Sequence, residues 1–155
     1  MITAGQALMI ALAAALQHIG SQPAGNAFVD LHDGVYQVAL IPVTNAAPGG
    51  LLIAVDHATG TSAPPRVTAD ARRPERRTGE SSISIAVAYD TAIAALQGFE
   101  NYDKQGRLTI VLRRDHYEVT FPPIVTGPMS RGIDYAYQVW VDAATSRVVK
   151  VLVPG

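Results

Sequence analysis

The chain has 155 residues, 48% of them hydrophobic and 16% charged, which predicts a folded core and excludes disorder over most of the length. The formal net charge is −1, which argues against a general nucleic-acid-binding protein. The sequence contains no cysteine, so disulfides, thiolate catalysis and cysteine metal sites are excluded.

The N-terminal stretch has the pattern of an amphipathic helix. Thr3 and Gln6 have the spacing of a capping box, apolar residues follow at helical intervals, and Gly20 provides a stop. Residues 7–16 also resemble the apolar core of a secretory signal, but no Lys or Arg precedes them and they are too short to span a bilayer. We therefore expect a structural helix, no membrane span and a cytoplasmic location, with the periplasm as the alternative.

Strand patterns follow this helix. Residues 27–43 are strand-like, and the Asp33-Gly34 pair between apolar residues is a strong hairpin signal. Residues 51–55 form a second strand pattern that ends in a turn at 56–60. A fourth strand is doubtful, because Pro64 and Pro65 remove backbone donors there.

A segment rich in proline and arginine then separates two halves of the chain. It predicts a linker over residues 69–81. Its arginines could bind an acidic surface of a partner, but a solvated linker is the simpler explanation. The arginines in question are Arg72, Arg73, Arg76 and Arg77.

The second half begins with another helix pattern and continues with four strand patterns. We expect a helix over 84–97, paired strands at 107–112 and 116–121, and a last pair at 135–141 and 147–153.

Short sequences recur between the two halves in the same order. Residues 14–17 return as 94–97, and the turn at 55–60 is answered at 141–146. We therefore predict an α+β protein made of two tandem repeats, each with one helix packed on an antiparallel sheet of three to four strands. The predicted divisions are a first repeat at 1–68, the linker at 69–81 and a second repeat at 82–155.

The second half resembles a PepSY domain, a family that closes with a strand, an Asp-x-x-Thr-Gly turn and another strand. Residues 137–151 carry this likeness, and Asp33-Gly34 with residues 55–60 carry it in the first half. Ser146 departs from the pattern because the family usually has glycine there. The resemblance implies a helix wrapped by an antiparallel sheet, as in the cystatin-like arrangement. It also implies binding, since related domains occur in peptidase propeptides, in inhibitors and among immunity proteins of bacterial toxin systems.

No constellation of residues predicts catalysis. The four histidines lack the spacing of a metal site, and neither a nucleophile elbow nor a phosphate-binding loop is present. Asp56 and Asp142 resemble a carboxylate pair, but both occupy turn positions in which an Asp side chain accepts backbone donors of its own turn. We therefore expect no enzyme activity, no cofactor and no metal.

These features favour a protein-binding module, an inhibitor or immunity protein that blocks a partner enzyme or toxin sterically. The alternative is a carrier with a pocket for a small ligand or peptide between helix and sheet. A homodimer formed by pairing between the edge strands of two copies is a further alternative. The aromatic residues of the second half fit either an interface or a core. The candidate partner-binding residues are Arg72, Arg73, Arg76, Arg77, Tyr135, Tyr137 and Trp140.

Overall fold

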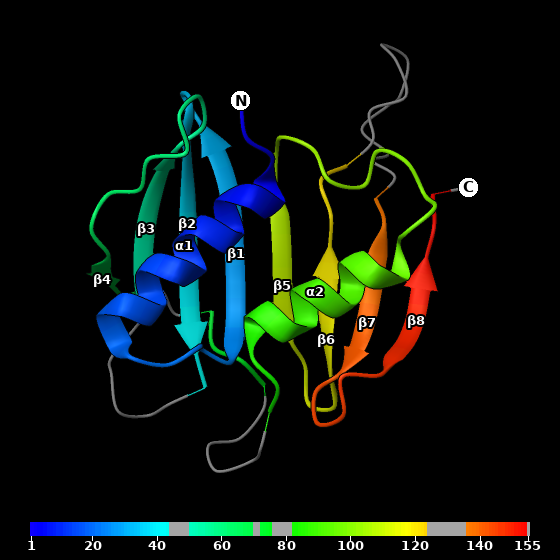
Figure 1. The fold of residues 1–155 in the computed structure, drawn as a ribbon. Helices are drawn as coiled ribbons and strands as arrows, with labels where there is room; N and C mark the ends of the chain where they lie inside the picture. The colour runs from blue at the N-terminus through cyan, green and yellow to red at the C-terminus, as the bar shows by residue number, and fades with distance from the viewer. Residues whose placement is uncertain (44–49, 70–71, 76–81, 124–135, 155) are drawn as a thin grey trace.

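The computed structural model describes residues 1–43, 50–69, 72–75, 82–123 and 136–154. Among these residues, one helix precedes four strands in each half of the chain, and both helices lie on the same face of the sheet (Figure 1). The elements are α1 (Ala4–Ile19), β1 (Gly25–His32), β2 (Val35–Pro42), β3 (Gly50–Asp56), β4 (Arg66–Thr68), α2 (Ile85–Ala95), β5 (Leu108–Leu112), β6 (His116–Thr120), β7 (Gln138–Asp142) and β8 (Val148–Leu152).

The eight strands of the described residues belong to one antiparallel sheet, in the order β4-β3-β2-β1-β5-β6-β7-β8. The two halves meet where β1 pairs with β5, with Ala27 opposite Ile110 and Val29 opposite Leu108. The prediction of two tandem units, each a helix on its own sheet of three to four strands, is therefore wrong. Each half would leave one long strand edge unpaired, and the β1–β5 ladder joins these edges into a single sheet.

Both helices begin at capped N-termini. Thr3 caps α1 in the predicted capping box with Gln6, and Gly20 ends this helix with a left-handed φ of 80°. Ser84 caps α2 by accepting a hydrogen bond from the backbone N–H of Val87. The first helix matches its predicted range, while α2 ends two residues before the predicted end.

The core lies between the helices and the sheet. Alternate side chains of each central strand point toward the helices, so that residues such as Val29, Val38, Ile110 and Val119 are fully buried. The inner faces of the two helices supply mostly alanine and leucine, which allows them to lie close to the strands.

The tight turn between β1 and β2 lies where its sequence predicts it. Asp33 and Gly34 both have positive φ, the backbone of a type I′ turn, and they join β1 to β2. The doubtful fourth strand exists as β4, a three-residue strand that begins directly after the two prolines. The predicted strand at 135–141 is shorter at its start, since β7 begins at Gln138.

The two equivalent turns at Asp56 and Asp142 have the same side-chain geometry. Asp56 Oδ1 accepts the backbone N–H groups of residues 58 and 59 at 2.9 Å each. Asp142 Oδ1 accepts those of residues 144 and 145 at 2.9 and 2.8 Å. These bonds confirm the turn explanation for both carboxylates.

Candidate interaction surface

The face of the sheet opposite the helices carries a cluster centred on Trp140. Val139 and Val141 point into the core, so Trp140 between them points to the opposite, helix-free face. Its neighbours across the strands are Glu118 on β6 and Lys150 on β8. Within the described residues, no helix covers this face (Figure 1).

The Trp140 indole lies between two basic side chains. The His116 ring stacks on it with 4.3 Å between ring centroids and 15° between ring planes. The Lys150 Nζ atom lies 4.9 Å from the indole centroid, a cation–π distance. The indole N–H donates to Gln138 Oε1 at 2.7 Å, and Gln138 Nε2 donates to Thr120 Oγ1 at 2.8 Å. These contacts hold the partly exposed indole in one orientation.

Glu118 connects this cluster to an ion-pair network. Its carboxylate oxygens lie 3.2 Å from His116 Nε2 and 3.4 Å from Arg113 Nε. The Arg113 guanidinium also donates to Glu75 Oε1 at 2.8 Å, and this hydrogen bond is the largest cause of its raised pKa. Because Arg113 and Glu75 are 43% and 53% exposed, their ion pair stabilises the fold by at most about 1 kcal/mol. Their main effect is to place charges of both signs around Trp140.

The segment 72–75 lies across the same face and is held to the sheet. The Arg72 guanidinium lies 3.8 Å from the centroid of the Phe28 ring, and its carbonyl accepts a hydrogen bond from Asn26 Nδ2 at 2.9 Å. The Glu75 backbone N–H donates to the Leu112 carbonyl at 3.2 Å. This part of the predicted linker is therefore attached to β1 and β5.

Asn26 is the buried residue that organises this attachment. It is only 3% exposed, and its Oδ1 accepts the backbone N–H of Leu112 at 2.7 Å while its amide donates to Arg72. Sequence reasoning did not identify Asn26, although a lone asparagine at the start of an apolar strand is a signal of a buried polar role.

The structure brings two of the predicted partner-binding residues to the helix-free face. Arg72 and Trp140 both lie there, and Arg73 is exposed in the same segment. Tyr137 is 7% exposed and belongs to the core, where its hydroxyl donates to the Glu100 carbonyl at 3.0 Å. This burial fits the core explanation of its ring better than the expected role in an interface. Three predicted residues, Arg76, Arg77 and Tyr135, lie outside the described residues.

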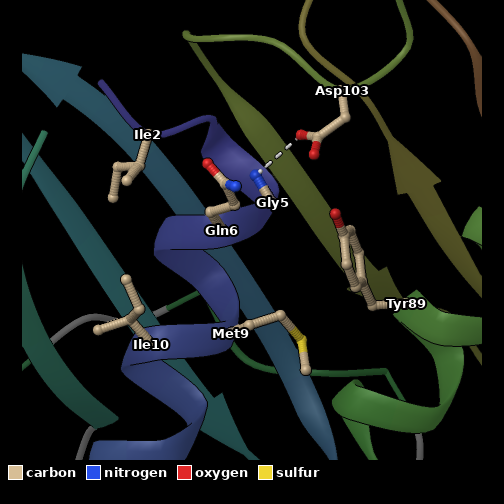
Figure 2. Close-up of a pocket in the computed structure, with 7 residues that line it drawn as sticks. All are labelled: Ile2, Gly5, Gln6, Met9, Ile10, Tyr89 and Asp103. Atoms are coloured by element: carbon tan, nitrogen blue, oxygen red, sulfur yellow. Dashed lines mark hydrogen bonds between the residues drawn. The ribbon is translucent and has the colours of Figure 1, made fainter. Parts of the chain in front are cut away.

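On the other face of the molecule, an open groove of about 380 Å³ lies along the outer side of α1 (Figure 2). Its lining is mainly apolar, with Ile2, Met9 and Ile10 from the α1 region and Tyr89 from α2. Asp103 closes one end and accepts hydrogen bonds from the Thr3 hydroxyl at 2.9 Å and the Gly5 backbone N–H at 3.1 Å. Burial and the nearby Asp103 carboxylate raise the pKa of the Tyr89 hydroxyl.

The described part of the chain offers neither a metal site nor a membrane-spanning helix. It contains no cluster of three or more His, Cys, Asp or Glu side chains that could hold a metal ion. None of its helices is long and apolar enough to cross a membrane.

Comparison with known proteins gives one weak likeness. No protein family matches the sequence, and no curated protein matches it. Among solved structures, the chain is similar to a crystal structure from Clostridium difficile 630 named as a "putative lipoprotein". The similarity covers 92% of this chain and 89% of that one, at 12% identity and a TM-score of 0.40. The resemblance to PepSY domains stays a prediction.

Proposed function

We propose that this chain is a non-enzymatic protein-binding module, an inhibitor or immunity protein that covers a surface of its partner sterically. The interface is the helix-free face of the sheet around Trp140. The observation that carries this proposal is the orientation of the partly exposed indole, which is held between His116 and Lys150.

An indole held in this way is suited to bind a protein. Tryptophan is one of the residues that most often dominate binding energy, and a side chain already fixed in one orientation loses little entropy when a partner covers it. The mixed charges of Glu118, Arg113 and Lys150 around the indole form a polar rim. A stable complex of this kind buries about 800 Å² on each partner, which extends well beyond Trp140 to neighbouring strands.

The test is capture of a partner from an extract of the source cells, with the wild type and two variants as bait. Trp140→Ala removes the proposed anchor, and Val67→Ala is the matched control on the distant strand β4, where Val67 is 75% exposed. Urea denaturation of each variant establishes that it is folded. We expect one stoichiometric partner with the wild type and the control, and at least about 30-fold weaker binding of that purified partner by Trp140→Ala.

Each other result has a definite meaning. If the partner binds Trp140→Ala as tightly as the wild type, the proposed interface is wrong, although the protein-binding function is still supported. A partner whose activity is unchanged in the complex contradicts the inhibitory role. Absence of any partner contradicts the binding function and favours the carrier.

The carrier alternative has one observation in its favour, the apolar groove beside α1 and Tyr89. This groove lies on the outer side of the helices, and the described space between helices and sheet is filled by buried side chains. A carrier would gain thermal stability in proportion to the logarithm of ligand concentration when small apolar ligands are added. The cytoplasmic location stays a prediction, which fractionation of the source cells would test.

A further inference from the structure

The groove beside α1 combines an apolar wall with a polar end. Its volume of about 380 Å³ lies in the range of pockets that hold small molecules. Ile2, Met9 and Ile10 supply apolar side chains, while Tyr89 and Asp103 bring oxygen atoms to the other side of α1 (Figure 2). A ligand that fills this groove therefore needs both an apolar part and a polar group.

The Tyr89 hydroxyl is a polar group that the protein leaves without a partner. Tyr89 is only 5% exposed, and its hydroxyl makes no hydrogen bond with the described residues. A tyrosine hydroxyl in a buried side chain usually has a partner. Figure 2 shows this hydroxyl pointing toward Gly5 and Asp103, at the polar end of the groove. It can therefore accept a hydrogen bond from a bound ligand.

The Asp103 carboxylate adds a negative charge at the same end. Its oxygens accept hydrogen bonds from the Gly5 N–H and the Thr3 hydroxyl, and each oxygen can accept one more. None of the ion pairs among the described residues involves Asp103. The N-terminus of α1 offsets this charge by only about half an elementary charge. The groove therefore has a net attraction for a cation.

Gly5 allows the two oxygen-bearing groups to come together. A Cβ atom at Gly5 would collide with the Tyr89 hydroxyl and would lie 2.8 Å from Asp103 Oδ1. Both oxygens therefore lie beside the Cα atom of Gly5, close enough for one donor group to reach both.

Hydrogen bonds hold the walls of the groove in place. The Ile2 backbone N–H donates to the His57 carbonyl at 2.8 Å, and the Ile2 carbonyl accepts from the Tyr36 hydroxyl at 3.1 Å. The Ala4 backbone N–H donates to the carbonyl of Lys104 at 2.8 Å, next to Asp103. The groove is thus formed before a ligand arrives, which lowers the entropy lost on binding.

We propose that this groove binds a small primary amine with an apolar chain. The ammonium group donates to Asp103 and to the Tyr89 hydroxyl, and the chain lies against Met9 and the two isoleucines. An ammonium group has three donors and no acceptor, which matches two neighbouring oxygen acceptors. A carboxylate would be repelled by Asp103, and an alcohol would leave its charge unpaired. The inference does not rest on the proposed function, because the groove and the helix-free face lie on opposite sides of the sheet.

The test is an NMR titration of the whole chain at pH 7 with hexylamine, which carries a positive charge at this pH. Hexanol and hexanoate have the same chain without that charge, and methylamine has the charge without the chain. We expect hexylamine to bind at least about 10-fold more tightly than each of these three, because hydrogen bonds between charged groups are the stronger ones. The shifted amides should be those of residues around Gly5, Met9 and Tyr89.

Three variants and a control assign the contacts. Asp103→Asn keeps an acceptor for the Gly5 N–H and removes the charge, so hexylamine should bind at least about 10-fold more weakly. Tyr89→Phe should also weaken binding. Met9→Trp fills the groove from a position that is 39% exposed, and it should weaken binding without touching the capping contacts. Asp90→Asn removes an exposed carboxylate beside Tyr89 that does not line the groove, and it should bind like the wild type. Urea denaturation establishes that each variant is folded.

Four results would overturn the proposal. The first is a wild type that does not bind hexylamine at concentrations up to about 10 mM. The second is equal binding of hexanol, which would make the groove an apolar site without recognition of charge. The third is an equal loss in Asp103→Asn and Asp90→Asn, which would indicate attraction to acidic residues in general. The fourth is full binding by Met9→Trp, which would place the amine elsewhere.

Discussion

The carboxylate of Asp103 accepts a hydrogen bond from the backbone N–H of Gly5 at 3.1 Å, although the two residues are 98 positions apart in the sequence. Its second oxygen accepts the Thr3 hydroxyl at 2.9 Å, so a residue of the second half satisfies the start of the first helix. Free N–H groups and a partial positive charge at a helix N-terminus make a carboxylate favourable at this position.

Replacement of Asp103 by alanine should therefore destabilise the whole protein. We expect a loss of about 1 to 2 kcal/mol in the free energy of unfolding, measured by urea denaturation. Asp90→Ala removes an exposed carboxylate from α2 and should change stability by less than about 0.5 kcal/mol. Equal losses in the two variants would contradict a specific role for Asp103.

Gly5 should not tolerate alanine, although alanine normally stabilises a helix by about 1 kcal/mol relative to glycine. A Cβ atom at Gly5 would collide with the Tyr89 hydroxyl and lie 2.9 Å from its Cζ atom. We expect Gly5→Ala to cost about 1 to 3 kcal/mol in urea denaturation. Tyr89→Phe removes the hydroxyl, so Gly5→Ala should cost less in that background. An additive double mutant would contradict this contact.

Asn26→Ala should loosen the join between the two halves. It leaves the buried Leu112 N–H without its side-chain partner, which costs about 1 to 3 kcal/mol, and it also removes the hydrogen bond to the Arg72 carbonyl. Hydrogen exchange should speed up at the Leu112 amide. Asn26→Asp keeps the acceptor for Leu112, so it should protect that amide better than alanine does. Unchanged exchange at Leu112 in Asn26→Ala would show that the bond is unimportant.

Ser146→Gly should stabilise the protein. Ser146 has a φ of 62°, while Gly60 has a φ of 75° at the equivalent turn of the first half. Left-handed backbone costs a non-glycine residue about 1 to 2 kcal/mol, and part of the gain is offset by the greater freedom of glycine in the unfolded chain. We expect a net gain of up to about 1 kcal/mol by thermal or urea denaturation, and a loss for Gly60→Ser.

Acid should weaken the turn at Asp56. Backbone hydrogen bonds from Thr59 and Ala58 lower the pKa of this carboxyl below its ordinary value of 3.8. A carboxyl with a lowered pKa in the folded state stabilises the fold above the unfolded-state pKa, and this contribution is lost as the pH falls through the folded pKa. NMR titration should therefore place the Asp56 midpoint below 3.8, and Asp56→Asn should reduce the pH dependence of stability in that acidic window. A midpoint at or above 3.8 would contradict the role of these bonds.

The features that could be predicted from the sequence are those decided by nearby residues. The capping box at Thr3, the Asp33-Gly34 turn and the turn at Asp142 each depend on residues within a few positions, so a local pattern is sufficient. The pairing of β1 with β5 depends on two strand edges far apart in the sequence. Alternation shows which side chains of a strand are buried and does not show which strand lies beside it.

The candidate interaction surface also depends on contacts between residues that are far apart in the sequence. Trp140 was identified as an aromatic residue on an alternating strand, and its partners His116 and Lys150 could be known only once β6, β7 and β8 were in register. Tyr137 lies just before β7, and its burial depends on the packing of its ring against Phe99 and Tyr102. The sequence does not predict the role of Asn26, because its hydrogen-bond partner Leu112 lies 86 positions away.

The hydrogen bond between the Thr3 hydroxyl and the Asp103 carboxylate also has a consequence for folding during synthesis on the ribosome. The first helix leaves the ribosome early, but its capping carboxylate and the strand that covers β1 are translated only after residue 100. At a translation rate of about 5 to 20 residues per second, the edge of β1 stays unpaired for several seconds before β5 is synthesised. A nascent chain arrested before β5 should therefore be sensitive to protease and bind chaperones, whereas one arrested after β8 has emerged should resist digestion.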